Sequence, residues 1–164
     1  MSLAFVKSPE GADPIIVEGL FQASAERMFA AWTTPSDIKQ WFGPGPGHLD
    51  EVDVDLREGG AWRFRYGMQD GQSNQLAGAY QEIEAPKKLV FSWIHTRAFE
   101  DGRAESTAES KVTITFDERD DGTLVRLVHE AIRTEDGRNG VGTGWNGTFV
   151  RLERVIDAQM TPAE

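Results

Sequence analysis

The last long stretch of the chain, residues 144–160, constrains the fold more than any other segment. Its large apolar side chains recur at intervals of four, three and four, and they are Trp145, Phe149, Leu152 and Ile156. On a helix with about 3.6 residues per turn, this spacing places all four on one stripe. A stripe led by Trp and Phe needs a broad apolar surface to pack against, so the preceding residues are expected to form a sheet.

Alternation of apolar and polar side chains indicates that sheet. A first strand is predicted at residues 15–21, and two short helices follow it, the first capped by Ser24 and the second starting at Pro35. From Glu51 onward, apolar residues recur at every second position, which is the period of a half-buried strand. The strands predicted in this part of the chain are residues 51–57, 62–66, 75–83, 87–95, 112–116 and 125–129.

Glycines interrupt this pattern in two places. Alternating glycine and proline at residues 43–47 exclude helix and interior strand, and predict a loop at the rim of the domain. Residues 135–144 combine glycines with charges and are expected to lead into the final helix. Gly147 lies inside that helix, where a glycine costs about 1 kcal/mol relative to alanine. It either lets the helix approach the sheet closely or opens the mouth of a cavity between them.

Charge and composition narrow the range of partners. With 27 acidic and 17 basic residues, the chain has a net charge of −10, which would repel nucleic acid and anionic membranes, so neither is expected as a partner. The sequence has no cysteine, no export signal and no window near the roughly 18 apolar residues of a membrane span, so we expect a cytoplasmic protein. Its three histidines are far apart, and we expect no metal site and no cofactor.

Six segments resemble the helix-grip domains of the START and Bet v 1 type (the SRPBCC superfamily), in particular bacterial proteins similar to the C-terminal domain of the Hsp90 ATPase activator Aha1. They are AERMFAAWT (25–33), IKQWFGP (38–44), DLREGG (55–60), GAYQEI (78–83), KLVFSW (88–93) and GW (144–145). The resemblance spans nearly the whole chain, so we expect one domain, residues 1–164. It implies an α+β fold in which a curved antiparallel sheet wraps around the long C-terminal helix, often with an apolar cavity between them, and two short helices follow the first strand.

Aromatic residues dominate the sheet face that is predicted to meet the helix. Such a face is either a packed core or the wall of an apolar cavity with a few orienting hydrogen bonds. The alternation of their strands predicts that His95 and His129 point inward. The alternative is that each lies at a solvated rim of the domain. Alternating charges, among them Asp53 and Arg63, are expected on the outer face. The residues expected to line the cavity are Trp62, Phe64, Tyr66, Phe91, Trp93, His95, His129, Trp145, Phe149 and Leu152.

Three functions are compatible with these features. The interpretation that we favour is binding of a small hydrophobic, aromatic or polycyclic molecule in the cavity, with no catalytic residue assigned. The second is a cyclase, dehydratase or hydrolase, which requires His95, His129, Tyr66 or a buried carboxylate to converge inside the cavity. The third is a module that contacts an Hsp90-type chaperone, which requires a packed core and an exposed apolar patch. An open sheet edge and the tendency of the family to form dimers are also compatible with a weak homodimer.

Overall fold

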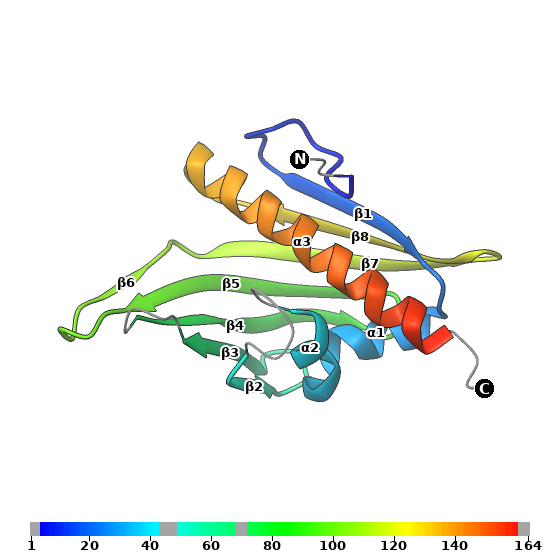
Figure 1. The fold of residues 1–164 in the computed structure, drawn as a ribbon, viewed down its shortest axis with the longest axis horizontal. Coiled ribbons are helices and arrows are strands. Elements are labelled where there is room, and N and C mark those ends of the chain that lie inside the picture. Colours follow the sequence, from blue (N-terminus) through cyan, green and yellow to red (C-terminus); the bar gives the residue numbers. More distant parts are fainter. Residues whose placement is uncertain (1–3, 43–48, 68–71, 161–164) are drawn as a thin grey trace.

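The chain runs through one strand, two short helices, a series of antiparallel strands and a long helix (Figure 1). These elements are β1 (Ile15–Phe21), α1 (Ala25–Thr33), α2 (Pro35–Trp41), β2 (Glu51–Val54), β3 (Ala61–Gly67), β4 (Ser73–Glu84), β5 (Lys88–Ala98), β6 (Ala104–Ser106), β7 (Ser110–Arg119), β8 (Gly122–Glu130) and α3 (Glu135–Met160). The computed structural model describes residues 4–42, 49–67 and 72–160, and the loop predicted at residues 43–47 lies outside these ranges.

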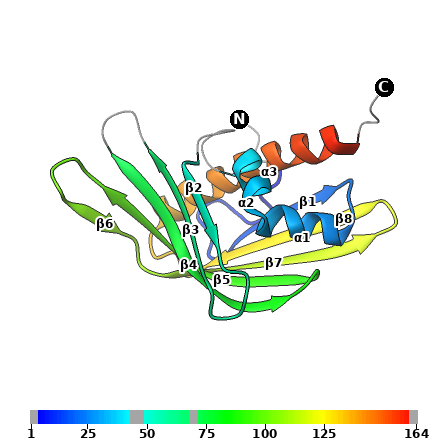
Figure 2. The ribbon, with the colours of Figure 1, turned by 90° about the horizontal axis from the view of Figure 1, so that it is seen from below.

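The strands form a single antiparallel sheet in the order β1-β8-β7-β5-β4-β3-β2, and β6 pairs with β5. Figure 2 shows that the sheet is strongly curved and that all three helices lie on its concave side. Helix α3 packs against β1 and α2, whereas α1 covers β7 and β8. The predicted helix-grip α+β fold is therefore confirmed, and the strand at residues 15–21 and the helix at residues 35–41 have the predicted bounds.

The apolar stripe of α3 lies at the centre of the core. Phe149 is completely buried, and its ring centroid lies 5.8 Å from that of Phe21 in β1. Trp32 of α1 contacts Phe149 and Trp41, with centroid distances of 6.0 and 4.5 Å. Such aromatic pairs contribute about 0.5–1.5 kcal/mol each beyond the burial of their area. The stripe thus joins α3 to β1 and α1, and Trp32 connects it to α2 through Trp41.

The outer face of the β2–β3 hairpin carries the charged pairs expected there. Arg63 Nη2 lies 2.8 Å from Asp53 Oδ2, and Arg57 Nε lies 2.9 Å from Asp55 Oδ2. All four side chains are largely exposed, so each pair contributes less than about 1 kcal/mol. These charges belong to a solvated surface.

Helix α3 begins at Glu135, so the prediction that residues 135–144 form a connection is wrong. Thr134 caps the helix, because its Oγ1 accepts a 3.0 Å hydrogen bond from the N–H of Gly137. Arg138 then holds the first turn in place by donating to the carbonyl oxygens of Gly11 and Ile132 at 2.6 and 2.9 Å. The cap and these tertiary bonds compensate for the low helix propensity of the glycines.

Gly78 of β4 has no room for a side chain. It faces Trp62 across the β3–β4 ladder, and the Trp62 indole N–H donates to the Ser92 carbonyl oxygen at 3.1 Å. A Cβ on Gly78 would overlap that same carbonyl oxygen. We therefore expect Gly78→Ala to lower the free energy of unfolding by about 2 kcal/mol, measured by urea titration. The control is Gly140→Ala, whose Cβ would meet no atom within 4 Å; equal losses in both variants would contradict the prediction.

Candidate functional site

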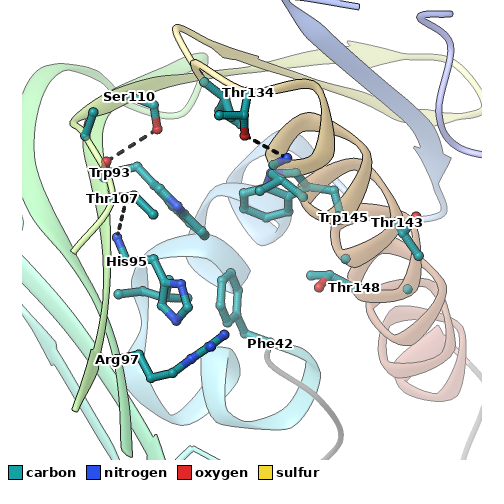
Figure 3. A pocket seen from close by; sticks show the side chains of 18 of the residues that line it. Phe42, Trp93, His95, Arg97, Thr107, Ser110, Thr134, Thr143, Trp145 and Thr148 are labelled. Carbon is teal, nitrogen blue, oxygen red and sulfur yellow. Dashed lines mark hydrogen bonds between the residues drawn. The ribbon is translucent and has the colours of Figure 1, made fainter. Parts of the chain in front are cut away.

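A cavity of about 970 Å³ lies between the inner face of β3–β5 and the N-terminal half of α3. Figure 3 shows Trp93, His95 and Arg97 of β5 on one side of this space, Trp145 of α3 on the other, and Phe42 from the end of α2 between them. The loop that precedes α3 and the connection that precedes β7 complete the lining. Small-molecule sites occupy roughly 300–1,000 Å³, so the cavity has the size of a ligand site.

Four glycines form part of the α3 side of the cavity. Gly137, Gly140, Gly144 and Gly147 recur at intervals of three, four and three, so they share one face of the helix, and all four line the cavity. A Cβ on Gly140 or Gly144 would meet no atom within 4 Å, and one on Gly147 would meet only the Arg151 guanidinium, at 3.6 Å. Close packing of the helix against the sheet therefore does not explain Gly147. The other explanation, that this glycine keeps the cavity open, agrees with the structure.

His129 lies behind the cavity wall and not inside the cavity. It is completely buried, and its Nδ1 accepts a 3.0 Å hydrogen bond from the Trp145 indole N–H. The ring proton is therefore on Nε2, which donates to Ser110 Oγ at 2.7 Å, and Ser110 donates to the Trp93 carbonyl oxygen at 3.4 Å. Burial lowers the pKa of His129 to about 3, so the imidazole is neutral near pH 7. His129 thus orients Trp145 and Ser110, which both line the cavity.

Tyr66, His95 and Arg97 make one end of the cavity polar. The register places Asn74 between Tyr66 and Arg97, and Asn74 Oδ1 lies 2.8 Å from His95 Nε2, which holds the imidazole in place. Burial and then the charge of Arg97 lower the pKa of His95. Burial raises the pKa of Tyr66, and Arg97 opposes this effect only in part. His95 and Tyr66 are therefore both neutral near pH 7.

The residues expected to line the cavity occupy two regions of the inner face. Tyr66, Trp93, His95 and Trp145 line the cavity. The structure places the others in the packed interior, and they are Trp62, Phe64, Phe91, His129, Phe149 and Leu152. Around Trp62, Phe64 and Phe91, beside α2, only about 20 Å³ of space remains. These three residues therefore belong to a packed core, which was the alternative interpretation of the aromatic face.

Residues 22–157 match the family model described as Activator of Hsp90 ATPase homolog 1-like protein. The chain belongs to this family. The match extends from the end of β1 to the last turns of α3, so it includes every wall of the cavity. No curated protein matches the sequence.

Solved structures show the same fold. An AHSA1 protein from Silicibacter pomeroyi has a TM-score of 0.73 and 22% identity, covering 89% of this chain and 99% of its own. A protein from Arthrobacter aurescens has a TM-score of 0.76 and 19% identity, covering 99% of this chain and 95% of its own. A protein from Rhodobacter sphaeroides has a TM-score of 0.73 and 23% identity, covering 92% of this chain and 97% of its own. At these identities the likeness establishes the fold alone.

Other lining residues were not singled out from the sequence. They are Phe42, Leu76, Arg97, Thr107, Ala108, Ser110, Ile132, Arg133, Thr134, Val141, Thr143, Thr148 and Arg151, and all of the four glycines except Gly147. Of these, the glycines carried a readable signal, because their spacing repeats that of the apolar stripe beside them. Within the described ranges, His, Asp and Glu side chains form no group of three that could hold a metal ion. Nor does any helix described here have the length and apolar character needed to cross a membrane.

Proposed function

We propose that the protein binds a small, largely apolar molecule, aromatic or polycyclic, in the cavity between the sheet and α3. The observation that carries this proposal is the row of glycines on α3. Each costs the helix about 1 kcal/mol relative to alanine. At Gly140 and Gly144 no neighbouring atom requires the small residue. Keeping the cavity open accounts for glycine at these positions.

The walls of the cavity suit a flat apolar ligand. The Trp93 and Trp145 ring centroids lie 5.3 Å apart, and that of Phe42 lies 5.8 Å from Trp145. Indole and phenyl faces offer large contact areas to a ligand ring and cost little conformational entropy on binding. The hydrogen bond from Trp145 to His129 fixes one of these faces in advance, which favours affinity.

Binding accounts for these walls better than catalysis or chaperone contact does. The described lining contains no Asp or Glu, and both ring nitrogens of His129 are engaged, so His95 and Tyr66 are the groups left for acid–base chemistry. Among the described residues, the exposed large apolar side chains are Leu20 in β1 and Leu56 just after β2. Because β1 and β2 are opposite edges of the sheet, these two do not form one patch.

Native mass spectrometry of the purified protein, followed by a thermal-shift screen of aromatic and polycyclic compounds, tests the proposal. We expect a retained small molecule or a rise in Tm that grows with ligand concentration. A free ligand concentration of a hundred times Kd adds about 2.7 kcal/mol of stability. No retained molecule and no shift across the library would contradict the proposal, and a pull-down with Hsp90-type chaperones would then test the alternative.

A further inference from the structure

The charge of the cavity is opposite to that of the whole chain. The net charge of the protein is −10. Nevertheless, the described lining of the cavity includes Arg97, Arg133 and Arg151 and contains no Asp or Glu. These arginines come from β5, from the loop before α3 and from α3 itself. A local excess of positive charge in an acidic protein attracts an anionic ligand into the cavity and disfavours a cationic one.

Two of the three arginines are less suited to binding a ligand than Arg97. Arg151 donates from Nε to the Trp41 carbonyl oxygen at 3.1 Å and from Nη2 to Thr148 Oγ1 at 3.3 Å, so its guanidinium already links α3 to α2. Arg133 and Arg97 are both exposed, but Arg133 lies in the loop before α3, whereas Arg97 lies on the strand that carries His95. Both add positive potential to the cavity.

Arg97 is the arginine best placed to contact a ligand anion. It follows His95 by two positions on β5, so both side chains lie on the same face, and Figure 3 shows them on the side of the cavity that faces Phe42. Among the described residues no carboxylate forms an ion pair with the Arg97 guanidinium. Its positive charge adds to the effect of burial in lowering the pKa of the neighbouring His95, and it opposes the rise that burial causes in the pKa of Tyr66. The electrostatic effect of Arg97 therefore extends into the cavity.

We propose that the ligand carries a carboxylate, which Arg97 binds at the polar end of the cavity while Phe42, Trp93 and Trp145 contact its apolar body. This inference rests on the proposed function. The guanidinium offers two parallel N–H donors that match the two oxygens of a carboxylate, and the Tyr66 hydroxyl offers a further donor nearby. A carboxylate places its two oxygens in one plane with the guanidinium, which fits a single arginine flanked by the neutral Tyr66 and His95.

Matched pairs of ligands test this inference. Each pair consists of an aromatic carboxylic acid with two to four fused rings and its primary amide, which has nearly the same shape but no charge. Binding is measured at pH 7.5 by calorimetry. We expect each acid that binds to bind at least about tenfold more tightly than its amide. This preference should shrink as salt is raised from about 0.05 to 0.5 M.

Two variants assign the preference to Arg97. We expect Arg97→Gln to bind acid and amide alike, with amide affinity unchanged, because only the charged contact is lost. Arg119→Gln is the matched control, since Arg119 forms an exposed pair with Asp117 beside the β7–β8 turn and lies outside the cavity lining. This control should keep the wild-type preference, and both variants should unfold with the wild-type Tm within about 2 °C, because surface substitutions change stability little.

The possible results separate this inference from the proposed function. Equal affinity of the wild-type protein for acids and amides, or binding of neutral compounds only, would overturn the inference and leave the proposed function intact. A preference that survives Arg97→Gln would overturn the role of Arg97. Tighter binding of phosphate esters of the same ring systems would overturn the choice of a carboxylate. Failure of every acid, amide and screened compound to bind would contradict the proposed function itself.

Discussion

Replacing Gly144 by phenylalanine is expected to weaken ligand binding about 50- to 100-fold without unfolding the protein. A Cβ at this position meets no atom within 4 Å, so the new ring extends into the space that a ligand would occupy. Displacing one ligand ring from the wall removes about 100 Å² of apolar contact, or about 2.5 kcal/mol at 25 cal/mol per Å². That loss corresponds to the stated decrease in affinity.

Gly144→Ala is the control for this substitution. Its methyl group is too small to displace a ring, so affinity should stay within about threefold of the wild-type value. The helix should gain up to about 1 kcal/mol, because alanine replaces glycine in its interior. Affinity is measured by calorimetry with a ligand from the thermal-shift screen, and stability by urea unfolding. Wild-type affinity in a folded Gly144→Phe variant would show that the ligand does not use this part of the cavity.

Replacing His129 by glutamine is expected to remove much of the acid sensitivity of the fold. The pKa of His129 is about 3 in the folded protein, against about 6.5 for an unfolded chain. Between these values the unfolded chain binds a proton that folded His129 excludes, so acidification through this window lowers the free energy of unfolding by up to about 1.4 kcal/mol per pH unit. This loss of stability is small at pH 7 and reaches about 2 kcal/mol at pH 5.

Urea unfolding at pH 7 and pH 5, followed by tryptophan fluorescence, measures this effect. The wild-type protein should lose about 2 kcal/mol more than His129→Gln between the two pH values. At pH 7 the variant itself should be less stable by about 1–3 kcal/mol, because glutamine cannot satisfy both Trp145 and Ser110 in the same geometry. His95→Gln serves as the comparison, since His95 is only partly buried and should account for a smaller share. Parallel pH profiles for wild type and His129→Gln would contradict the assignment.

The elements of the fold could be predicted because their signals are local. Pro35 follows Thr34 at the first turn of α2, and the helix runs from Pro35 to Trp41 as expected. Strand period is equally local, and the apolar positions of β3 and β7 face the core as their alternation predicts. The stripe of α3 was recognisable for the same reason, since Phe149 and Leu152 need only the helical repeat to be assigned inward.

The cavity could be predicted only in part, because strand parity identifies a face but not what covers it. Trp62 and Tyr66 lie on the same face of β3, yet Trp62 is packed beside α2 and Tyr66 lies beyond it, in the cavity. His129 has the inward parity expected from β8, but Trp145 of α3 donates to it and closes it off from the cavity. Which helix covers which end of a strand is a tertiary property that the alternation does not contain.

The start of α3 was missed because glycine content outweighed the capping signal. Thr134 followed by Glu135 and Asp136 is a sequence typical of a helix N-terminus, and the structure begins the helix there. Intrinsic propensity argues against a helix through Gly140 and Gly144, and the tertiary bonds of Arg138 outweigh it.

The glycine row also has an evolutionary consequence. On α3, the width of the cavity is set by side chains that are absent, and restoring them one at a time, from glycine to alanine, valine or leucine, would exclude larger ligands in steps. At Gly140 and Gly144 the first of these steps, to alanine, would touch neither the sheet nor the buried stripe, because a Cβ there meets no atom within 4 Å. Selectivity for ligand size can therefore diverge among descendants of this chain while the fold is preserved. A lineage that abandons ligand binding is expected to lose these glycines first, and to become more thermostable as it does so.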